Sequence, residues 1–176
     1  MTEKHSSRLD SSTFEELFLR DRSLIDTRAP IEFARGSFPG AVNLPLMTDV
    51  EREQVGIRYK EQGEHAAVAL GHELVSGHVK EGRIAAWIEQ VKRNANAALF
   101  CFRGGLRSQT VQAWLASEGY HLPVVDGGYK ALRAYLQNSL EKCLSDTSPV
   151  VIGVRTGVAT TSLLNQSSDM LRLPVI

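Results

Sequence analysis

The sequence predicts an α/β domain with a mainly parallel sheet, because short apolar segments alternate along the chain with longer segments of helical periodicity. The apolar segments are "SLIDTR" (23–28), "NAALFCF" (96–102) and "LPVVDGG" (122–128). The helical segments "LRSQTVQAWLASEGY" (106–120) and "YKALRAYLQNSLEKCL" (129–144) place apolar residues on one helical face. The length of 176 residues allows one such domain and a fragment of a second.

The composition fits a globular protein, with 43% hydrophobic and 23% charged residues. No apolar run approaches the roughly 18 residues that a membrane-spanning helix needs, and the first residues lack the apolar core of an export signal. We therefore expect a cytoplasmic protein without membrane contact, in which Cys101 and Cys143 are reduced thiols. The formal net charge of zero argues against a broad basic surface for nucleic acid but leaves local contacts through a few arginines open.

Capping and turn residues divide the first part of the chain. "SSTFEELFLR" (11–20) combines Ser and Thr with Glu15 and Glu16, which is typical of a helix start. "GSFPGAVNLP" (36–45) surrounds a short apolar pair with Gly and Pro, so we expect a loop, a short strand and a second loop. We expect residues 1–13 to be an N-terminal tail and residues 14–145 to form the domain.

Residues 48–94 are polar with helical periodicity, which predicts a helical insert in the domain. Breaks between its helices are expected at Gly63, Gly77 and Gly82. The apolar residues near helical spacing are Leu70, Leu74, Trp87, Ile88 and Val91. The insert also contains three histidines whose spacing does not fit a zinc site, so no metal is predicted; they are His65, His72 and His78.

Cys101 ends the strand predicted over 96–102, at the edge of a parallel sheet where functional sites lie. Gly104 and Gly105 then permit a sharp turn before a helix begins near Leu106. Successive amides in such a turn form an anion-binding site at the helix N-terminus. The sequence therefore predicts an anion-binding loop around a thiol.

Cations beside this thiol favour a chemical role. Arg103 and Arg107 flank the glycines, and their charge would stabilise a thiolate together with the helix dipole and the loop amides. A thiolate is a nucleophile and can carry a transferred sulfur or selenium atom. An inert buried cysteine needs no such surroundings, so we interpret Cys101 as functional and Cys143, on the predicted helix 129–144, as structural.

Several motifs resemble the rhodanese domain family. "LIDTRAPIEFARGSFPGAVNLP" (24–45) is similar to its opening motif, an Asp-x-Arg strand end, Glu-Phe and then Gly-x-x-Pro-Gly-Ala-x-Asn-x-Pro. "LFCFRGGLRS" (99–108) is similar to its active-site loop, and "VVDGGYKALRAYL" (124–136) to its closing Gly-Gly and helix. The resemblance covers most of residues 14–138 and implies a rhodanese-like fold.

Four residues at neighbouring strand ends are expected to support the thiol loop. Asp26 and Arg28 either form an ion pair that fixes the loop or position the donor, and the sequence leaves both roles open. Gly127 and Gly128 match the closing glycines of the family and complete the set.

The length of the thiol loop is compatible with two chemistries. Five residues separate Cys101 from Arg107, one more than is usual in sulfurtransferases. Cys-x5-Arg-Ser is also the spacing of cysteine-dependent phosphatases, including the rhodanese-related Cdc25 type. Those phosphatases usually have His before the cysteine, where this chain has Phe100.

Residues 51–71, 101–115 and 127–133 are similar to the rhodanese domain of bacterial tRNA 2-selenouridine synthases. That family joins this domain to a P-loop domain and converts wobble 2-thiouridine in tRNA to 2-selenouridine. Its selenium comes from selenophosphate, and an S-geranylated intermediate implies geranyl diphosphate for the full-length family. The resemblance implies Cys101 as the catalytic residue, no bound cofactor, and a small anionic chalcogen donor. The loop implied to bind this donor is Phe102, Arg103, Gly104, Gly105, Leu106, Arg107 and Ser108.

Residues 148–176 resemble a truncated, degenerate start of a P-loop unit. Gly153, Gly157 and Thr161 match part of a nucleotide-binding loop, but Ala159 and Thr160 stand where its second glycine and its lysine belong. Without that lysine no cation reaches the phosphates, so we expect no nucleotide binding by this loop.

The sequence thus predicts a rhodanese-like domain that transfers sulfur or selenium through Cys101, with tRNA as the partner implied by resemblance. Full tRNA activity would need the P-loop domain, which leaves a separate P-loop partner chain open. Two other functions also stay open: a Cdc25-like cysteine phosphatase and a non-catalytic remnant of the synthase.

Overall fold

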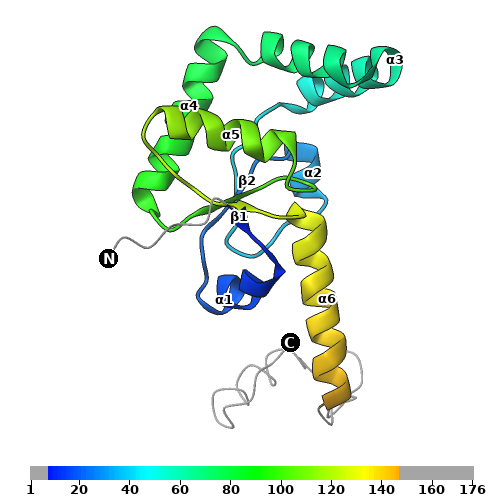
Figure 1. Ribbon diagram of the computed structural model, residues 1–176, viewed down its shortest axis with the longest axis vertical. Coiled ribbons are helices and arrows are strands. Elements are labelled where there is room, and N and C mark those ends of the chain that lie inside the picture. Colours follow the sequence, from blue (N-terminus) through cyan, green and yellow to red (C-terminus); the bar gives the residue numbers. More distant parts are fainter. Residues whose placement is uncertain (1–7, 147–176) are drawn as a thin grey trace, which may run out of the picture. The chain divides into compact units, whose positions relative to one another are not determined.

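The computed structural model describes residues 8–146 and contains a five-stranded sheet in the order β1-β5-β4-β2-β3 (Figure 1). Neighbouring strands are parallel, which confirms the predicted fold class. The strands are β1 (Arg8–Leu9), β2 (Leu24–Asp26), β3 (Val42–Asn43), β4 (Ala98–Phe100) and β5 (Val124–Val125). The sheet belongs to the first of two compact units, Met1–Ser139 and Leu140–Ile176.

β4 is the central strand and pairs with β2 on one side and with β5 on the other. Phe100 lies opposite Asp26, and Leu99 lies opposite Val124. Because these three strands run in the same direction, their carboxyl ends meet at one edge of the sheet. The segments that follow β2, β4 and β5 therefore lie side by side, although they are far apart in the sequence.

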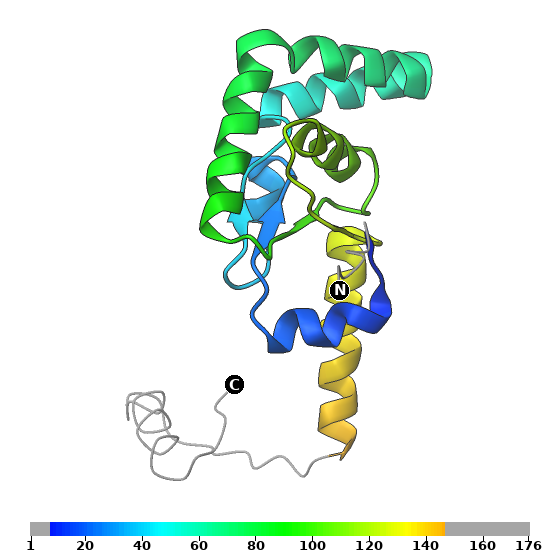
Figure 2. The ribbon, with the colours of Figure 1, turned by 60° about the vertical axis from the view of Figure 1, so that its left-hand side comes forward.

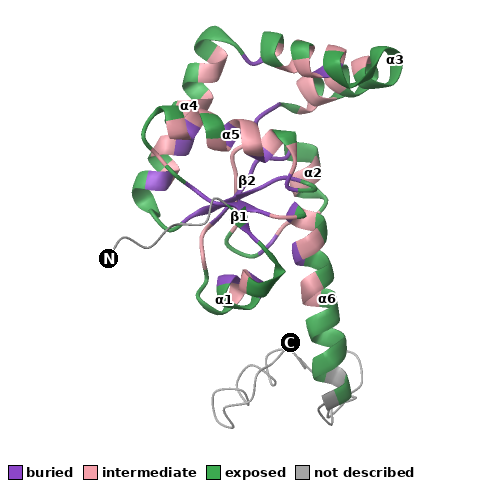
Figure 3. Ribbon diagram, viewed as in Figure 1, coloured by how far each residue is buried: buried purple, intermediate pink, exposed green. Residues whose placement is uncertain are grey.

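Helices cover both faces of the sheet, because successive side chains of each strand point to opposite sides (Figure 2). The helices are α1 (Phe14–Leu19), α2 (Pro30–Ala34), α3 (Asp49–Leu74), α4 (Gly77–Arg93), α5 (Leu106–Ser117) and α6 (Gly128–Asp146). Leu99 packs in one apolar cluster with Trp87 of α4 and with α5. Phe100 packs in a second cluster with Phe14 of α1 and Leu132 of α6, so the strands are buried on both sides (Figure 3).

The N-terminal segment differs from the sequence prediction. Residues 8–13, expected to belong to a tail, form β1 and a 3-10 helix, η1 (Ser11–Thr13). Asp10 caps this turn, since its carboxylate accepts a hydrogen bond from the Ser12 amide at 2.9 Å. A strand of two residues has too few side chains for a period-two pattern, and only its pairing with β5 makes it recognisable.

The predicted helical insert consists of α3 and α4. A capping box starts α3, in which Thr48 and Glu51 each accept a backbone hydrogen bond from the other. Gly63 interrupts α3 with φ 80° and ψ −176°, and Gly77 begins α4, as expected. The break predicted at Gly82 is wrong, because it lies inside α4, where packing of the apolar face outweighs the modest helix penalty of one glycine.

The predicted P-loop remnant, residues 148–176, lies outside the described residues, so its Gly153, Gly157 and Thr161 remain a prediction. Within residues 8–146, no helix combines the length and the apolar character that crossing a membrane requires. Of the two predicted functional loops, the described residues therefore include the thiol loop and not the P-loop remnant.

We expect Gly63→Ala to lower the free energy of unfolding by about 1–3 kcal/mol, because this backbone conformation is essentially restricted to glycine. The matched control is Gly82→Ala, at a regular helical position where an added Cβ has no neighbour within 4 Å. That control should raise stability by about 0.5–1 kcal/mol. Urea denaturation of both variants measures the difference, and changes of the same sign would contradict the assigned break.

Candidate functional site

Cys101 lies directly after β4, at the carboxyl edge of the sheet, and is only 3% exposed. Its carbonyl oxygen accepts a hydrogen bond from the Tyr129 amide at 2.8 Å. The next carbonyl, of Phe102, accepts one from the Lys130 amide at 3.1 Å. The first amides of α6 therefore hold the start of the thiol loop, which satisfies donors that a helix N-terminus leaves unpaired.

Three glycines allow the thiol loop and the loop before α6 to approach backbone to backbone. Gly104 has φ 65°, and an added Cβ would lie 2.5 Å from the carbonyl oxygen of Val125. Gly128 has φ 56°, and its Cβ would overlap with the carbonyl oxygen of Cys101. Gly127 has φ 72°; its amide nitrogen would lie 2.9 Å from a Cβ at Gly104, and its own Cβ would clash with the Ala131 side chain of α6. The closing glycines thus lie against the thiol loop, where larger residues would not fit.

The Cys101 thiol has two polar neighbours. The Ser108 hydroxyl lies 3.3 Å from Sγ and 3.1 Å from the Gly105 carbonyl oxygen, and Sγ lies 3.8 Å from that same oxygen. A hydroxyl has one proton to donate, so a neutral thiol can donate to Gly105 while a thiolate can accept from Ser108. The geometry therefore offers a hydrogen-bond donor to the ionised form of the thiol.

The N-terminus of α5 is open toward the loop. Gly105 is its N-cap and has no side chain to bond the first amides, and the first turn contains no acidic residue. The amides at the start of a helix have no partner within the helix and, with its dipole, attract anions. An anion bound near Cys101 would therefore be stabilised without a cation.

Arg107 is engaged differently from the sequence prediction. Both of its terminal nitrogens donate to the Glu32 carboxylate of α2, which the sequence interpretation had not identified as its partner. Arg103 is exposed, and its guanidinium carbon lies 5.8 Å from the centre of the Phe102 ring. Within residues 8–146, neither guanidinium hydrogen-bonds to Cys101, so the predicted support of the thiolate by these two charges remains a prediction.

Glu32 forms a polar link between α2 and α5. Burial opposes its ionisation, but the hydrogen bonds and charge of Arg107, the Ala29 amide and the charge of Arg52 together hold the pKa of Glu32 below its ordinary value of 4.5. The carboxylate also accepts the Ala29 amide at 3.1 Å, which caps α2. Its place in the Glu-Phe pair of the opening motif was the only sequence signal for this residue.

Asp26 and Arg28 form a buried ion pair at the end of β2, with 2.6 Å between Nη2 and Oδ2. Ser37 donates to the same carboxylate oxygen, and Arg28 also donates to the Gly36 carbonyl oxygen at 2.9 Å. The guanidinium carbon lies 4.0 Å from the centre of the Tyr129 ring. Of the two roles left open above, the geometry favours the ion pair, since Arg28 is only 2% exposed and its Nε and Nη2 donate to groups within the protein.

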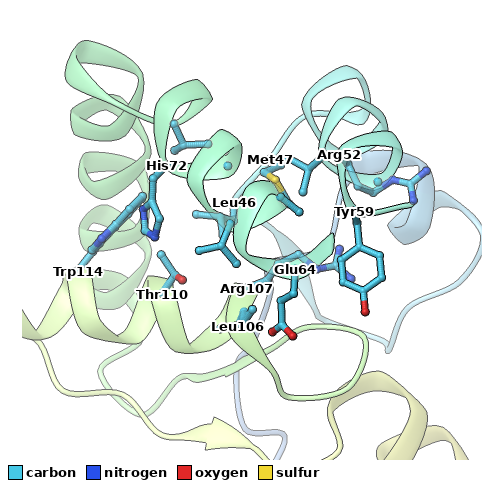
Figure 4. Close-up of a pocket in the computed structure, with 16 residues that line it drawn as sticks. Leu46, Met47, Arg52, Tyr59, Glu64, His72, Leu106, Arg107, Thr110 and Trp114 are labelled. Atoms are coloured by element: carbon cyan, nitrogen blue, oxygen red, sulfur yellow. The ribbon is translucent and has the colours of Figure 1, made fainter. Parts of the chain in front are cut away.

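A cavity of about 430 Å³ lies between the insert helix α3 and α5 (Figure 4). Trp114 and His72 are at one end, and Tyr59 and Arg52 are at the other. Leu106 and Arg107 line it too, so the cavity adjoins the first turn of α5. Its lining is mainly apolar, which suits a hydrophobic group better than a small anion.

The histidines of the insert do not belong to a cluster of potential metal ligands in the described part of the chain. His72 packs against Trp114 with ring centres 6.3 Å apart. Among residues 8–146, no group of three or more His, Cys, Asp and Glu side chains is placed to hold a metal ion.

Comparisons with known proteins show what the chain is similar to. The sequence profile of the rhodanese-like domain matches residues 10–135. The chain is 51% identical over 165 residues to a tRNA 2-selenouridine synthase of Pseudomonas fluorescens strain Pf-5, covering 94% of this chain and 45% of that protein. A synthase of the same name from Bordetella bronchiseptica strain RB50 is 54% identical over 167 residues, with the same coverage.

A solved structure shares the fold. The N-terminal domain of a protein from Clostridium difficile 630 has 28% identity and a TM-score of 0.62, covering 73% of this chain and 98% of that chain. The chain thus spans less than half of the length of the curated relatives it matches, but nearly all of a domain solved separately.

We expect Gly104→Ala to lower the free energy of unfolding by about 3 kcal/mol or more, since its Cβ would collide with backbone atoms at a positive φ. Gly105→Ala is the matched control in the same loop, with φ −96° and no neighbour within 4 Å of the added Cβ. Its effect should stay within about 1 kcal/mol. Thermal unfolding of both variants tests this, and an equally tolerated Gly104→Ala would show that the loops are not packed as described.

The Glu32–Arg107 pair predicts a pH-dependent contribution to stability. The folded-state pKa of Glu32 is lowered, so its stabilisation is present above about pH 4.5 and is lost as the pH falls through the folded-state pKa. Glu32→Gln should therefore cost about 1–2 kcal/mol at pH 7 and progressively less below pH 4.5. Melting temperatures between pH 3 and pH 7 test this, with the exposed Glu53→Gln as control. A difference that does not shrink in acid would contradict the assignment.

Proposed function

The chain belongs to the rhodanese-like domain family, and we propose that it transfers sulfur or selenium through a covalent adduct on Cys101. The observation that carries the proposal is a free thiol at the carboxyl end of the central strand, beside the uncapped N-terminus of α5. Such a site supplies a nucleophile and stabilises the anion on which it acts. The geometry of Ser108 supports the same role, because its hydroxyl can donate to a thiolate.

The transfer step can be written for thiosulfate as a simple donor. The Cys101 thiolate attacks the outer sulfur, the sulfur–sulfur bond of the donor breaks, and sulfite leaves with the bonding electron pair. The product is a persulfide, whose terminal anion would lie among the amides of the loop Phe102–Ser108. A second nucleophile then takes the terminal sulfur and restores the thiolate.

The physiological substrates are proposed from the relatives. Proteins about half identical to this chain are named tRNA 2-selenouridine synthase, which supports tRNA as the acceptor and a selenium donor such as selenophosphate. Because the chain spans 45% of those proteins, we propose for it the chalcogen-handling part of the reaction. Any nucleotide-binding step would need a P-loop domain, in the same protein or in a separate partner chain. A reduced thiol at Cys101 fits a cytoplasmic setting.

We also propose a place for the geranyl group that the synthase resemblance implies. The apolar walls of the cavity between α3 and α5 suit a hydrocarbon chain.

A cysteine phosphatase is the less favoured alternative. The matched relatives are synthases by name, and Arg107, which would have to bind the phosphate, is paired with Glu32. A non-catalytic remnant differs from both enzymes because its thiol would form no adduct. Both alternatives can be separated from chalcogen transfer by one experiment.

We expect the full chain to gain the mass of one sulfur atom after incubation with thiosulfate, and Cys101→Ala to gain none. The matched control is Cys143→Ala, which removes the exposed cysteine of α6 and should load as the wild type does. Intact-protein mass spectrometry measures the adduct, and a parallel incubation with selenosulfate, from which sulfite leaves in the same way, compares selenium with sulfur.

Adduct formation on Cys101→Ala would refute Cys101 as the carrier. A wild-type thiol that reacts with iodoacetamide but takes no chalcogen would refute the transfer proposal. It would direct attention to hydrolysis of an aryl phosphate and its inhibition by vanadate. A thiol that neither reacts nor loads would identify a non-catalytic remnant.

A further inference from the structure

An exposed ring and an exposed guanidinium follow the reactive thiol in the chain. Phe102 comes directly after Cys101 and is 38% exposed, although it is large and apolar. Arg103 is exposed beside it, within cation–π distance of the ring. Neither side chain is needed to hold the thiol, whose hydrogen bonds come from Gly105 and Ser108.

Phe102 is fixed in position without being buried. Its carbonyl oxygen is held by the Lys130 amide, and its ring is nearly parallel to that of Tyr129, with 22° between planes and 6.3 Å between centres. Tyr129 is itself packed against the buried Arg28 guanidinium. A ring that already rests against a neighbouring ring has less conformational freedom to lose when a ligand stacks on it.

The neighbouring start of α6 is basic. Lys130 and Arg133 are exposed and three residues apart, which places them on one helical face. They are the only charged residues from position 127 to position 140. Figure 1 shows this first part of α6 beside the loop that leads into α5, as the hydrogen bond between Lys130 and Phe102 requires.

This combination is suited to an unpaired nucleotide. Bases of single-stranded RNA stack on aromatic rings and on guanidinium planes, while lysine and arginine bind the adjacent phosphates. A duplex would not expose a base face to the ring, and the zero formal net charge offers no broad surface for its two backbones.

We propose that Phe102 and Arg103 form a stacking platform for an unpaired base of the RNA substrate, and that Lys130 and Arg133 bind its flanking phosphates. The inference rests on the proposed function, since an RNA acceptor follows from the relatives. It adds the residues that would bring an unpaired base to the thiol. An acceptor base in an RNA loop is already unpaired, so little energy is needed to extrude it.

Binding of a labelled RNA hairpin with one 2-thiouridine in its loop tests the platform, measured by fluorescence anisotropy with the full chain. Phe102→Ala should weaken binding roughly five- to a hundredfold, and Phe102→Tyr, which keeps the ring, should stay within about twofold of wild type. Arg103→Lys keeps the charge but loses the planar group, and should also weaken binding.

Salt dependence tests the phosphate contacts separately. The double variant Lys130→Ala/Arg133→Ala should reduce the slope of log affinity against log salt by about 1.4, because each contact to a single strand contributes about 0.7. Lys92→Ala, an exposed lysine in the last turn of α4, is the matched control and should leave binding unchanged.

The proposal is overturned if the wild type does not bind the hairpin, binds a fully paired duplex equally well, or binds normally with Phe102→Ala. Should Phe102→Ala fail to fold, unchanged binding by Arg103→Lys is the result that overturns it. Sulfur loading of Cys101 is measured without RNA, so its failure refutes the transfer proposal and does not affect the binding result.

Discussion

The position of the thiol depends on the backbone contact between two loops at the carboxyl edge of the sheet. The loop after β4 and the turn before α6 approach so closely that Gly104 and Gly128 have no room for a Cβ. The same approach lets the first amides of α6 bond to the carbonyl oxygens of Cys101 and Phe102. Both ends of this contact are therefore needed before the thiol can lie beside the start of α5.

Two of the arginines around the thiol loop, Arg28 and Arg107, form ion pairs within the protein. Arg28 neutralises Asp26 in the interior and supports Tyr129, while Arg107 is paired with Glu32. A buried charge pair costs desolvation and contributes little net stability, but removing one partner leaves the other uncompensated. An anion bound in this loop would meet backbone amides and the open N-terminus of α5, with the exposed Arg103 as the cation outside these pairs.

The proposals above assign two surfaces near the segment that follows Cys101 to different parts of one reaction. The mainly apolar cavity lies between α3 and α5, and the aromatic and basic surface lies where the loop meets α6. Within the insert it is α3 that contributes most of the cavity lining, whereas α4 contributes none of it. A chalcogen carrier between a hydrophobic site and an RNA-binding site would fit the relatives named as tRNA 2-selenouridine synthases.

The sequence by itself determined the parallel α/β class, the thiol at the end of the best strand, and the closing glycines. Those features depend on local patterns: apolar runs, helical spacing, and residues that permit a tight turn. It also marked Gly63 correctly and Gly82 incorrectly, because a glycine alone does not show whether packing will keep a helix intact.

Only the tertiary structure decided which groups meet. Glu32 and Arg107 are 75 residues apart in the chain and pair because α2 and α5 begin at the same edge of the sheet. The strand β1 exists only through its pairing with β5. Local composition cannot encode such contacts, because a side chain pairs with whichever group the fold brings within reach. Here the fold pairs Arg107, which the sequence suggested as a ligand for substrate, with Glu32 inside the protein.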